Sequence, residues 1–410
     1  MTLSRRTLVK SLCSIPIYSA VAKGLPAALS VPTTLPDKLS FPFSGVCLDA
    51  AFTHPLGVHA DVAAKDYLAS RMHDANRSWP GDNARNSAVE LFSTLINADP
   101  TEIAIVPSTM EGENLIGAAV GLGPSAGVVT DAFHYDASLA MYGELHLLRG
   151  VPVSVVKPKN NQIDLRDLDS LIQKNTRLVA ISLVASMTGF QHDLKSLCEI
   201  AHAKGALVYA DIIQAAGAVP IDVKQSGVDF CCCGSYKWLM GDFGTAFLYV
   251  RADRLDHLRR VQFGWRQFTG EVQHVYPFDP PGPAIGDWKL GTGTISHFEV
   301  STPDWAALAV AVGSLTYIRN IGVETIQRYR QPMLDSLQCE LPRRGFMPLT
   351  PASSRGPIVS FAYKDADRKL GPILSRAKVK ITLYENMIRI SPSVYNDMDD
   401  IDHLLNVLNV

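Results

Sequence analysis

The sequence lacks three features that would place it in a specialised class of protein. Its 410 residues contain no run of about 18 apolar residues, the length that an apolar helix needs to cross a membrane. Its seven cysteines are too few and too irregularly spaced for a disulfide scaffold. The 38 basic and 40 acidic residues nearly cancel, so no excess of positive charge points to nucleic acid or to an anionic membrane. What remains is an ordinary folded chain, 47% hydrophobic, with enough length for two or three domains.

The first thirty residues have the features of an export signal. Arg5 and Arg6 precede a weakly apolar stretch, which ends in the small residues 20–22. This order predicts a twin-arginine signal peptide over residues 1–30 and export of the folded protein to the periplasm. A basic arm on a cytoplasmic enzyme is the alternative. Prolines recur between residues 24 and 42 and disfavour regular structure there, so we assign residues 31–60 to a tether and lead-in segment.

Helical and strand patterns alternate from about residue 61 onward. Short apolar runs joined through helical stretches, such as 86–96 and 194–204, predict an α/β fold with a mostly parallel, seven-stranded sheet flanked by helices. The pattern changes near residue 302, so we expect a large domain over 61–301 and a smaller α+β C-terminal domain over 302–410. The seven apolar runs are 103–106, 127–129, 153–156, 178–183, 206–209, 230–233 and 246–250.

Three consecutive cysteines, 231–233, fall within one of these runs. Neighbours on a strand point to opposite faces, so these thiols are poorly placed to pair with one another. They also lack the Cys/His spacing of a zinc site. We therefore expect small buried strand residues and no metal site.

Two segments near the middle of the chain carry the chemistry. An apolar run ends in Asp211, and another is followed by Lys237. In a doubly wound sheet, ligands gather at the carboxyl ends of the strands, where both side chains would lie. Apolar neighbours would lower the pKa of the lysine and make its amine nucleophilic. A Schiff-base lysine and an aspartate on a pyridinium nitrogen are the pair that pyridoxal phosphate requires. Taken singly, the aspartate could be a turn residue and the lysine a surface residue.

Several further segments match one family in chain order: 48–55, 97–103, 108–114, 130–135, 289–294 and 387–397. From residue 47 to its end, the chain resembles the class V aminotransferase family of fold-type I pyridoxal-phosphate enzymes. The branch it resembles contains cysteine desulfurases and isopenicillin N epimerase. The resemblance implies a large domain built on a mostly parallel sheet, a smaller C-terminal domain, and pyridoxal 5'-phosphate as the cofactor.

The resemblance also implies a role for each matching residue near the cofactor ring. Lys237 matches the lysine that forms the Schiff base, Asp211 the pyridinium partner, and Gln214 the contact to the phenolic oxygen. Ser186 falls where relatives often carry asparagine near the same oxygen. Tyr135 falls where the family places the ring stacked over the pyridine, and the neighbouring His134 stays an alternative.

Other matches concern the phosphate and the substrate. Thr109 and Met110 lie in the phosphate loop, where Met110 replaces a hydroxyl residue, and Ser235 matches a phosphate ligand. A turn that leads into a helix offers unpaired N–H groups to a phosphate. Thr292 lies in the loop that reaches the phosphate of a neighbouring subunit, which implies a homodimer. Arg389 matches the arginine that binds the substrate carboxylate, a task suited to its planar guanidinium.

The family resemblance does not determine the reaction. It implies a small amino-acid-type substrate and a Lys237 that moves protons as general base and acid. A cysteine desulfurase needs a mobile cysteine in the C-terminal domain. Residues 378–386 contain none and Cys339 lies in an earlier helical stretch, so we do not expect this activity.

Transamination, epimerisation, decarboxylation and elimination stay open. We assign an aminotransferase-like enzyme, with an exported tailoring enzyme acting on a peptide or siderophore precursor as the alternative. A pyridoxal-phosphate-binding protein without turnover is a third possibility. Candidates to line the substrate pocket are Phe52, Thr53, His54 and the aromatic cluster 263–268, for which core or dimer packing is the alternative.

Overall fold

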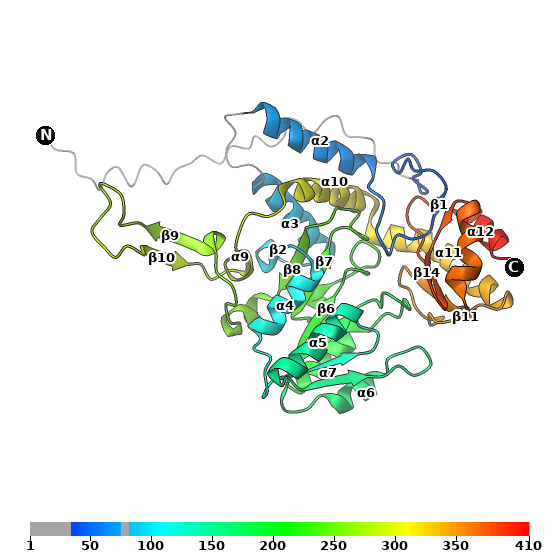
Figure 1. The fold of residues 1–410 in the computed structure, drawn as a ribbon, viewed down its shortest axis with the longest axis horizontal. Coiled ribbons are helices and arrows are strands. Elements are labelled where there is room, and N and C mark those ends of the chain that lie inside the picture. Colours follow the sequence, from blue (N-terminus) through cyan, green and yellow to red (C-terminus); the bar gives the residue numbers. More distant parts are fainter. Residues whose placement is uncertain (1–33, 75–81, 410) are drawn as a thin grey trace. The chain divides into compact units, whose positions relative to one another are not determined.

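The computed structural model describes residues 34–74 and 82–409. The signal peptide expected over residues 1–30 lies outside these residues, as do the first residues of the expected tether. Two main sheets organise the described chain, one of seven strands and one of four (Figure 1). Buried apolar clusters cover both faces of the larger sheet, and a separate cluster lies against the smaller one.

The seven-stranded sheet has the strand order β2-β8-β7-β6-β5-β3-β4. Strand β8 is antiparallel to both of its neighbours, and every other neighbouring pair is parallel. Each strand overlaps one of the seven apolar runs in the sequence, so the expected α/β fold with a mostly parallel sheet is confirmed. The strands are β2 (Ile103–Val106), β3 (Gly127–Asp131), β4 (Val153–Val156), β5 (Thr176–Ser182), β6 (Leu207–Asp211), β7 (Phe230–Gly234) and β8 (Ala246–Val250).

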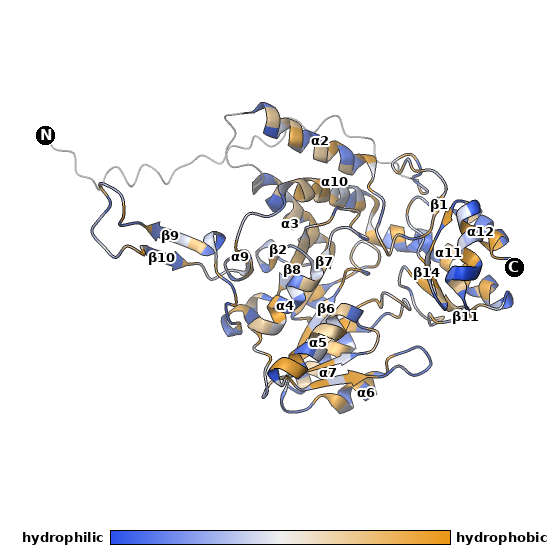
Figure 2. Ribbon diagram, in the orientation of Figure 1, coloured by the Kyte–Doolittle hydropathy of each residue, from blue (hydrophilic) through white to orange (hydrophobic). Residues whose placement is uncertain are grey.

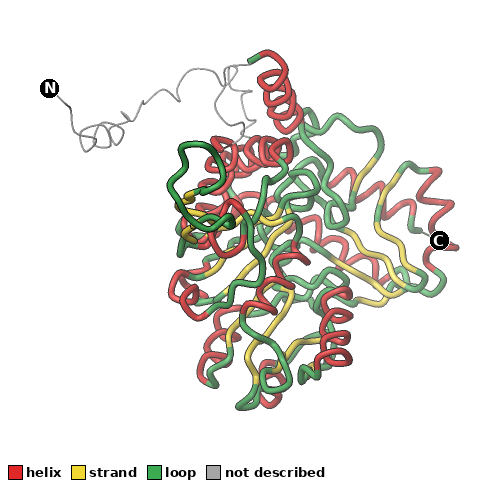
Figure 3. Tube along the Cα trace, turned by 60° about the vertical axis from the view of Figure 1, so that its left-hand side comes forward, coloured by secondary structure: helices red, strands yellow, loops and turns green. Residues whose placement is uncertain are grey.

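Helices cover both faces of this sheet, so that strands lie inside and helices outside (Figure 3). Residues of α4 and α5 belong to the apolar cluster on one face, and residues of α3, α6, α7 and α10 belong to the cluster on the other. Hydrophilic and hydrophobic residues alternate along outer helices such as α2 (Figure 2). These helices are α2 (Val58–His73), α3 (Asp82–Ile96), α4 (Thr109–Ala119), α5 (Asp136–Arg149), α6 (Leu165–Leu171), α7 (Leu194–Ala203), α8 (Val223–Ser226) and α10 (Trp305–Ile321), with the short 3-10 helices η1 (Pro100–Glu102), η2 (Ala252–His257) and η3 (Trp265–Gln267).

The three consecutive cysteines lie on β7 and are fully buried. Cys231 and Cys233 belong to the apolar cluster on one face of the sheet, and Cys232 belongs to the cluster on the other. Their interpretation as small buried strand residues is confirmed.

The second sheet is antiparallel, with the strand order β11-β12-β15-β14. The N-terminal strand β1 pairs in parallel with β13, so the lead-in segment joins the C-terminal part of the fold. The helix expected to open the second domain, α10, instead contributes Trp305, Leu308 and Leu315 to the core of the large sheet. The remaining elements are β1 (Val46–Cys47), α11 (Val323–Arg343), β11 (Met347–Pro348), β12 (Val359–Ala362), α12 (Ala366–Arg376), β13 (Val379–Lys380), β14 (Thr382–Tyr384), β15 (Met387–Ile390) and α13 (Met398–Val407).

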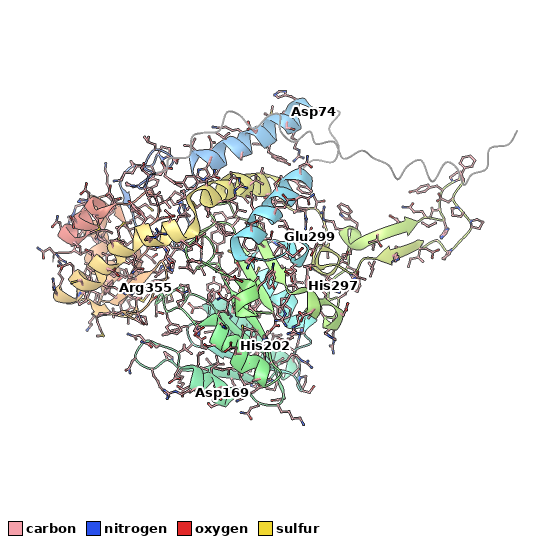
Figure 4. The ribbon with its side chains drawn as sticks, turned by 180° about the vertical axis from the view of Figure 1, so that it is seen from behind. Asp74, Asp169, His202, His297, Glu299 and Arg355 are labelled. Atoms are coloured by element: carbon pink, nitrogen blue, oxygen red, sulfur yellow. The ribbon has the colours of Figure 1, made fainter. Side chains whose placement is uncertain are left out.

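A hairpin of β9 (Phe268–Val272) and β10 (Asp287–Leu290) extends away from the rest of the fold (Figure 1). The sequence analysis did not anticipate it. The buried carboxylate of Glu299, labelled in Figure 4, ties its base to the sheet. Arg85 of α3 and Arg266 of η3 each donate to Glu299 Oε2 at 3.1 Å, and the amide of Ile105 in β2 donates to Oε1 at 2.9 Å. A buried carboxylate with several donors stabilises the arrangement of its neighbours, because moving a donor away would leave the buried charge less well compensated.

Within the described residues, no single helix is long and apolar enough to cross a membrane. The bent pair α10 and α11 reaches the required length and composition only when the two helices are taken together, and they meet at 76°.

Candidate active site

Three charged residues far apart in sequence come together at the carboxyl edge of the large sheet. Asp211 is the last residue of β6, and Lys237 follows the end of β7. Arg389 comes from β15 of the smaller sheet, and its positive charge acts on Lys237 together with the negative charge of Asp211. The structure therefore assembles the three charged residues that the sequence singled out.

Lys237 is half-buried, and burial lowers the pKa of its amine to about 8. The charge of Asp211 opposes this shift, whereas the charge of Arg389 adds to it. The amine lies 5.7 Å from the ring centre of Tyr236. A buried amine with a lowered pKa is neutral in a useful fraction of molecules near neutral pH, so Lys237 can act as a nucleophile or as a base.

Asp211 is almost completely buried, and burial raises the pKa of its carboxyl to about 6. The amide of Ile213 donates to its Oδ1 at 2.9 Å and opposes the shift, as do the positive charges of His134 and Lys237. No side chain among the described residues donates a hydrogen bond to this carboxylate. It can therefore accept one from a protonated ring nitrogen.

The raised pKa of Asp211 predicts how the stability of the ligand-free protein depends on pH. Because the pKa is higher in the folded protein than the unfolded value of 3.8, the contribution of Asp211 to stability is full below pH 4 and is lost as the pH rises through about 6. Above that pH the folded state carries a buried charge that costs up to about 3 kcal/mol. Chemical denaturation at pH 5 and pH 8 should show this loss in the wild type and not in Asp211→Asn. An equal loss in both proteins would contradict the assignment.

The start of α4 contains the segment that the sequence analysis assigned to the phosphate loop. The Ser108 side chain caps the helix by accepting from the amide of Glu111 at 3.1 Å. Thr109 Oγ accepts from the amide of Gly234 at 2.9 Å, which ties α4 to the end of β7. Gly112 allows this close packing, because a Cβ there would lie 2.5 Å from Cys232 Sγ. The first N–H groups of a helix have no partner within it, so this helix start can bind an anion.

The other two residues expected near the phosphate take part in contacts of their own. Met110 is half-buried, and its sulfur lies 3.4 Å from the hydroxyl of Ser138. Ser235 is buried, and its hydroxyl donates to the carbonyl of Asp242. This hydroxyl still has acceptor capacity, but it would have to turn to donate to a phosphate.

The two candidates for the ring-stacking residue have different surroundings in the structure. His134 is buried, with Nε2 2.8 Å from Glu113 Oε1 and Nδ1 2.9 Å from Ser182 Oγ. Tyr135 is 41% exposed, and its phenol lies within electrostatic range of Tyr236, next to Lys237. The ring of Tyr135 is therefore free to contact a ligand, whereas His134 belongs to a buried network. Sequence reasoning missed Glu113, because an acidic residue on a helix usually marks the solvent face.

Gln214 and Ser186 bind the surrounding backbone and side chains. Gln214 Nε2 donates to the carbonyl of Ala51 at 3.0 Å, and its Oε1 accepts from the indole of Trp238 at 2.8 Å. The carbonyl of Ser186 accepts from Arg389 Nη1 at 2.9 Å. Gln214 thus connects the lead-in segment to the lysine loop, and one of its amide hydrogens stays available for a ligand.

Arg389 is buried and held on two sides. Besides its contact to Ser186, Nη2 donates to Thr382 Oγ at 2.9 Å and lies 3.8 Å from Asp49 Oδ1. Its Nε is buried without a hydrogen-bond partner among the described residues. A buried N–H without a partner is costly, so this edge of the guanidinium fits a carboxylate that arrives from outside the chain.

The remaining predicted residues lie further out. Thr292 is exposed in the turn between β10 and α9 (Thr294–Phe298), at the base of the hairpin. His54 is buried, with Nε2 2.8 Å from Ser393 Oγ, so its ring belongs to the packed interior and does not line an open pocket. Phe52 is exposed beneath the Lys380 amine, and the aromatic cluster 263–268 lies at the base of the hairpin.

Comparison with known proteins identifies the family. The family model for aminotransferase class V matches residues 70–404, which include all ten residues assigned to the site. The chain belongs to this family. Pyridoxal phosphate is the family's cofactor, as the sequence analysis expected, and the residues described above fit it: a helix start that can bind an anion, a buried carboxylate without a side-chain donor and a lysine with a lowered pKa.

Curated relatives of this class V chain have two kinds of name. An uncharacterised aminotransferase, YcbU of Bacillus subtilis, is 25% identical over 360 residues, which cover 88% of this chain and 91% of the relative. A cysteine desulfurase of Klebsiella pneumoniae is 26% identical over 358 residues, which cover 78% and 81%. Other desulfurases match at similar identity.

Solved structures show the same fold. The apo structure of a cysteine desulfurase from Thermococcus onnurineus has a TM-score of 0.79 at 20% identity, and covers 92% of this chain and 98% of its own. A cystine C–S lyase in complex with its product cysteine persulfide has a TM-score of 0.78 at 19% identity, with coverage of 90% and 99%. At such identities the likeness establishes the fold, and the reaction has to be argued from the site.

Proposed function

We propose that this chain is a pyridoxal-phosphate-dependent enzyme that acts at the α-carbon of an amino acid or of a compound that contains one. The observation that carries the proposal is that Lys237, Asp211 and Arg389 come together. They lie after the end of β7, at the end of β6 and on β15. A protein that only bound the cofactor would have no use for a buried arginine edge open to a carboxylate.

Each part of the site has a defined task in this proposal. Lys237 would hold the cofactor through its amine, Asp211 would contact the ring nitrogen, and the start of α4 with Thr109 would bind the phosphate. When bound, pyridoxal phosphate supplies a ring that accepts electrons from the α-carbon of the substrate. Tyr135 is available to cover one face of that ring, and Thr292 to reach a second subunit.

The chain's own residues then control protons and orientation. Arg389 would fix the substrate carboxylate, which sets the direction of the bonds at the α-carbon. Lys237, once released, can remove a proton from that carbon and return one, since its pKa of about 8 is close to neutral pH. Transamination, epimerisation and elimination all begin with removal of this proton, whereas decarboxylation would use Lys237 only to return one, and we propose aminotransferase-like chemistry as the first to assay.

An absorbance spectrum of the purified protein tests this proposal. Wild-type protein with pyridoxal phosphate should show the visible band of lysine-bound cofactor, and Lys237→Ala should lose it. The rate of band formation should rise about tenfold per pH unit below pH 8 and level off above it, because only the neutral amine reacts. Lys224→Ala, on the exposed surface of α8, is the matched control and should behave as wild type. An unchanged band in Lys237→Ala would reject the assignment.

Sulfur transfer is the main alternative reaction, because many curated relatives are named cysteine desulfurases. The short connection between β14 and β15, residues 385–386, contains no cysteine. Of the described cysteines, Cys339 is exposed on α11, and burial raises the pKa of the half-buried Cys47, which disfavours its thiolate.

An assay with L-cysteine separates these alternatives. We expect alanine to form no faster than with Lys237→Ala. Formation of alanine and sulfide that depends on both Lys237 and Cys339 would establish a desulfurase instead.

We further propose export through the twin-arginine route, on the sequence order around Arg5 and Arg6. A periplasmic enzyme is separated from cytoplasmic amino-acid pools, which would favour a peptide or siderophore precursor as substrate. Fractionation of cells that produce wild type and a variant with both arginines changed to lysine tests this. If wild type and variant stayed in the cytoplasm to the same extent, the export proposal would be wrong and the enzyme would be cytoplasmic.

We also propose a homodimer held by the β9–β10 hairpin. The hairpin and its tip expose a set of apolar side chains that a monomer would leave in water, and Thr292 lies at its base. A second copy of the chain is the occupant that the exposed Thr292 and the family resemblance favour. The exposed apolar residues are Val272, Val275, Tyr276, Phe278, Ile285 and Trp288.

Shortening the hairpin should therefore dissociate the dimer. Val272 and Asp287 are paired, so replacing residues 273–286 with Asn-Gly closes the strands with a favoured two-residue turn. Light scattering should show a mass near two chains of 44.6 kDa for wild type and near one chain for this variant. Met347→Ser, which changes an exposed apolar residue on β11, is the control and should stay dimeric. A dimeric shortened variant would contradict the proposal.

A further inference from the structure

A completely buried carboxylate lies on the helix that carries the phosphate loop. Glu113 of α4 has no exposed surface, and an unpaired charge at such a place would be very costly. Three donors surround it: His134 Nε2 at 2.8 Å, Ser138 Oγ at 2.6 Å and the Tyr142 hydroxyl at 2.7 Å. All three can donate, and an ionised carboxylate only accepts, so the network is satisfied when Glu113 is charged.

The hydrogen bonds alone do not determine whether Nδ1 of His134 carries a proton. Its Nε2 carries the hydrogen given to Glu113, and its Nδ1 lies 2.9 Å from Ser182 Oγ, which can either donate or accept. The carboxylates that face the ring are Glu113 from α4, Asp131 from β3 and Asp211 from β6. Together they outweigh the effect of burial and raise the pKa of His134 above its ordinary value. The imidazole is therefore expected to carry both protons and a positive charge.

This charge lies beside Asp211. Ser182, which contacts His134, is the register partner of Asp211 on the neighbouring strand. The positive charge of His134 favours the ionised form of Asp211, the negative charge of Glu113 disfavours it less strongly, and Lys237 is the other cation nearby. Since Lys237 changes its protonation and its partner during the proposed reaction, His134 is the constant cation on this side of the site.

The surrounding titratable groups do not replace this cation. Asp131 Oδ2 lies 3.1 Å from His192 Nε2, without the geometry of a hydrogen bond, and its Oδ1 accepts from the amide of Phe133 at 2.8 Å. Tyr142 and Tyr209 are buried phenols whose pKa values are raised by burial, so both stay neutral. The same holds for the thiol of Cys232.

From this geometry we infer that Glu113 and His134 form a buried ion pair that keeps the carboxylate of Asp211 ionised and so positions the cofactor ring nitrogen. Glu113 acts through His134, so both are positioning residues with no need to touch the cofactor. The inference rests on the proposed function, because Asp211 matters through that ring nitrogen.

Nuclear magnetic resonance of ¹⁵N-histidine in the full-length protein tests the charge directly. The signal of His134, assigned by its absence in His134→Gln, should show both ring nitrogens still protonated above the ordinary pKa value of 6.5. Glu113→Gln should make the ring neutral at pH 7. A neutral His134 at pH 7 in the wild type would overturn the inference. The wild-type measurement needs no cofactor, so it stays informative even if the proposed function fails.

Cofactor affinity tests the link to Asp211. Glu113→Gln and His134→Gln should each weaken binding of pyridoxal phosphate by about tenfold, the effect of one pKa unit. In an Asp211→Asn background neither change should weaken it further, because the carboxylate they support is gone. Equal weakening in both backgrounds would show a merely structural role and overturn the inference.

The structure offers a matched control in another histidine–carboxylate pair. His202 of α7, labelled in Figure 4, has its Nε2 2.8 Å from Asp229 Oδ2, and Asp229 is buried. His202→Gln breaks this pair away from the proposed site and should leave cofactor affinity unchanged. A tenfold loss in this control as well would mean that any broken pair weakens binding, which would count against the inference.

Discussion

Replacing Asp211 with asparagine should lower turnover by about 10³-fold while pyridoxal phosphate still binds, the size of effect seen when one preorganised electrostatic group is lost. The carboxylate is buried at the end of β6 and has no side-chain donor among the described residues, so a protonated ring nitrogen is the partner it fits. Asparagine keeps the shape but cannot stabilise that proton as a charge. Exchange of the α-hydrogen of amino acids for deuterium in heavy water measures the loss for transamination, epimerisation or elimination, which all break the bond from the α-carbon to hydrogen, and release of carbon dioxide measures it for decarboxylation.

Two comparisons make this result specific. Asp222→Asn changes an aspartate that caps the short helix α8 at the surface, and it should exchange hydrogen at the wild-type rate. The spectrum of Asp211→Asn should still show lysine-bound cofactor, which excludes simple loss of binding. Activity within tenfold of wild type would mean that Asp211 does not contact the ring nitrogen.

Changing Arg389 to lysine should lower kcat/KM by about 100-fold for substrates that carry an α-carboxylate. Lysine keeps the positive charge but loses the planar fork, and each charge-assisted hydrogen bond lost costs about 1.5–3 kcal/mol. The unpartnered Nε and the anchoring contacts to Ser186 and Thr382 all depend on the guanidinium shape. We expect the loss to fall mainly on KM, because the contact exists before and during the reaction.

The substrate itself provides the sharpest control for this variant. An amine that lacks the carboxylate should react at similar rates with wild type and Arg389→Lys. Arg368→Lys, on the exposed face of α12, should match wild type with every substrate. An equal loss for both kinds of substrate would indicate that Arg389 supports the fold rather than the carboxylate.

The sequence was most informative where its pattern follows backbone geometry. All seven strands of the large sheet were predicted, because buried parallel strands are continuous apolar runs. Asp211 and Lys237 were paired for the same reason, since each follows such a run and parallel strands end at one edge. Arg389 needed the family resemblance, because nothing in the local pattern of β15 indicates which face meets the site.

The features that the sequence did not reveal depend on tertiary partners. The β9–β10 hairpin has mostly exposed strands and several prolines between them, so it lacks the alternation that marks a half-buried strand. Glu113 could not be recognised as buried, because its three donors come from the following loop and helix. Likewise, only the fold shows that His134 points inward and Tyr135 outward.

The pairing of β1 with β13 has a consequence for the order in which the protein is made. Val46 lies beside Val379, and the backbone of Asp49 bridges to Ser391, so the earliest described strand can pair only after residues far later in the sequence have been synthesised. Lys237 and Asp211 leave the ribosome long before Arg389. A nascent chain can therefore form much of the large sheet but not the finished site, which closes only when residues 46–49 meet residues 379–391. A chain terminated before residue 389 would have Lys237 without the arginine that we propose binds the substrate carboxylate.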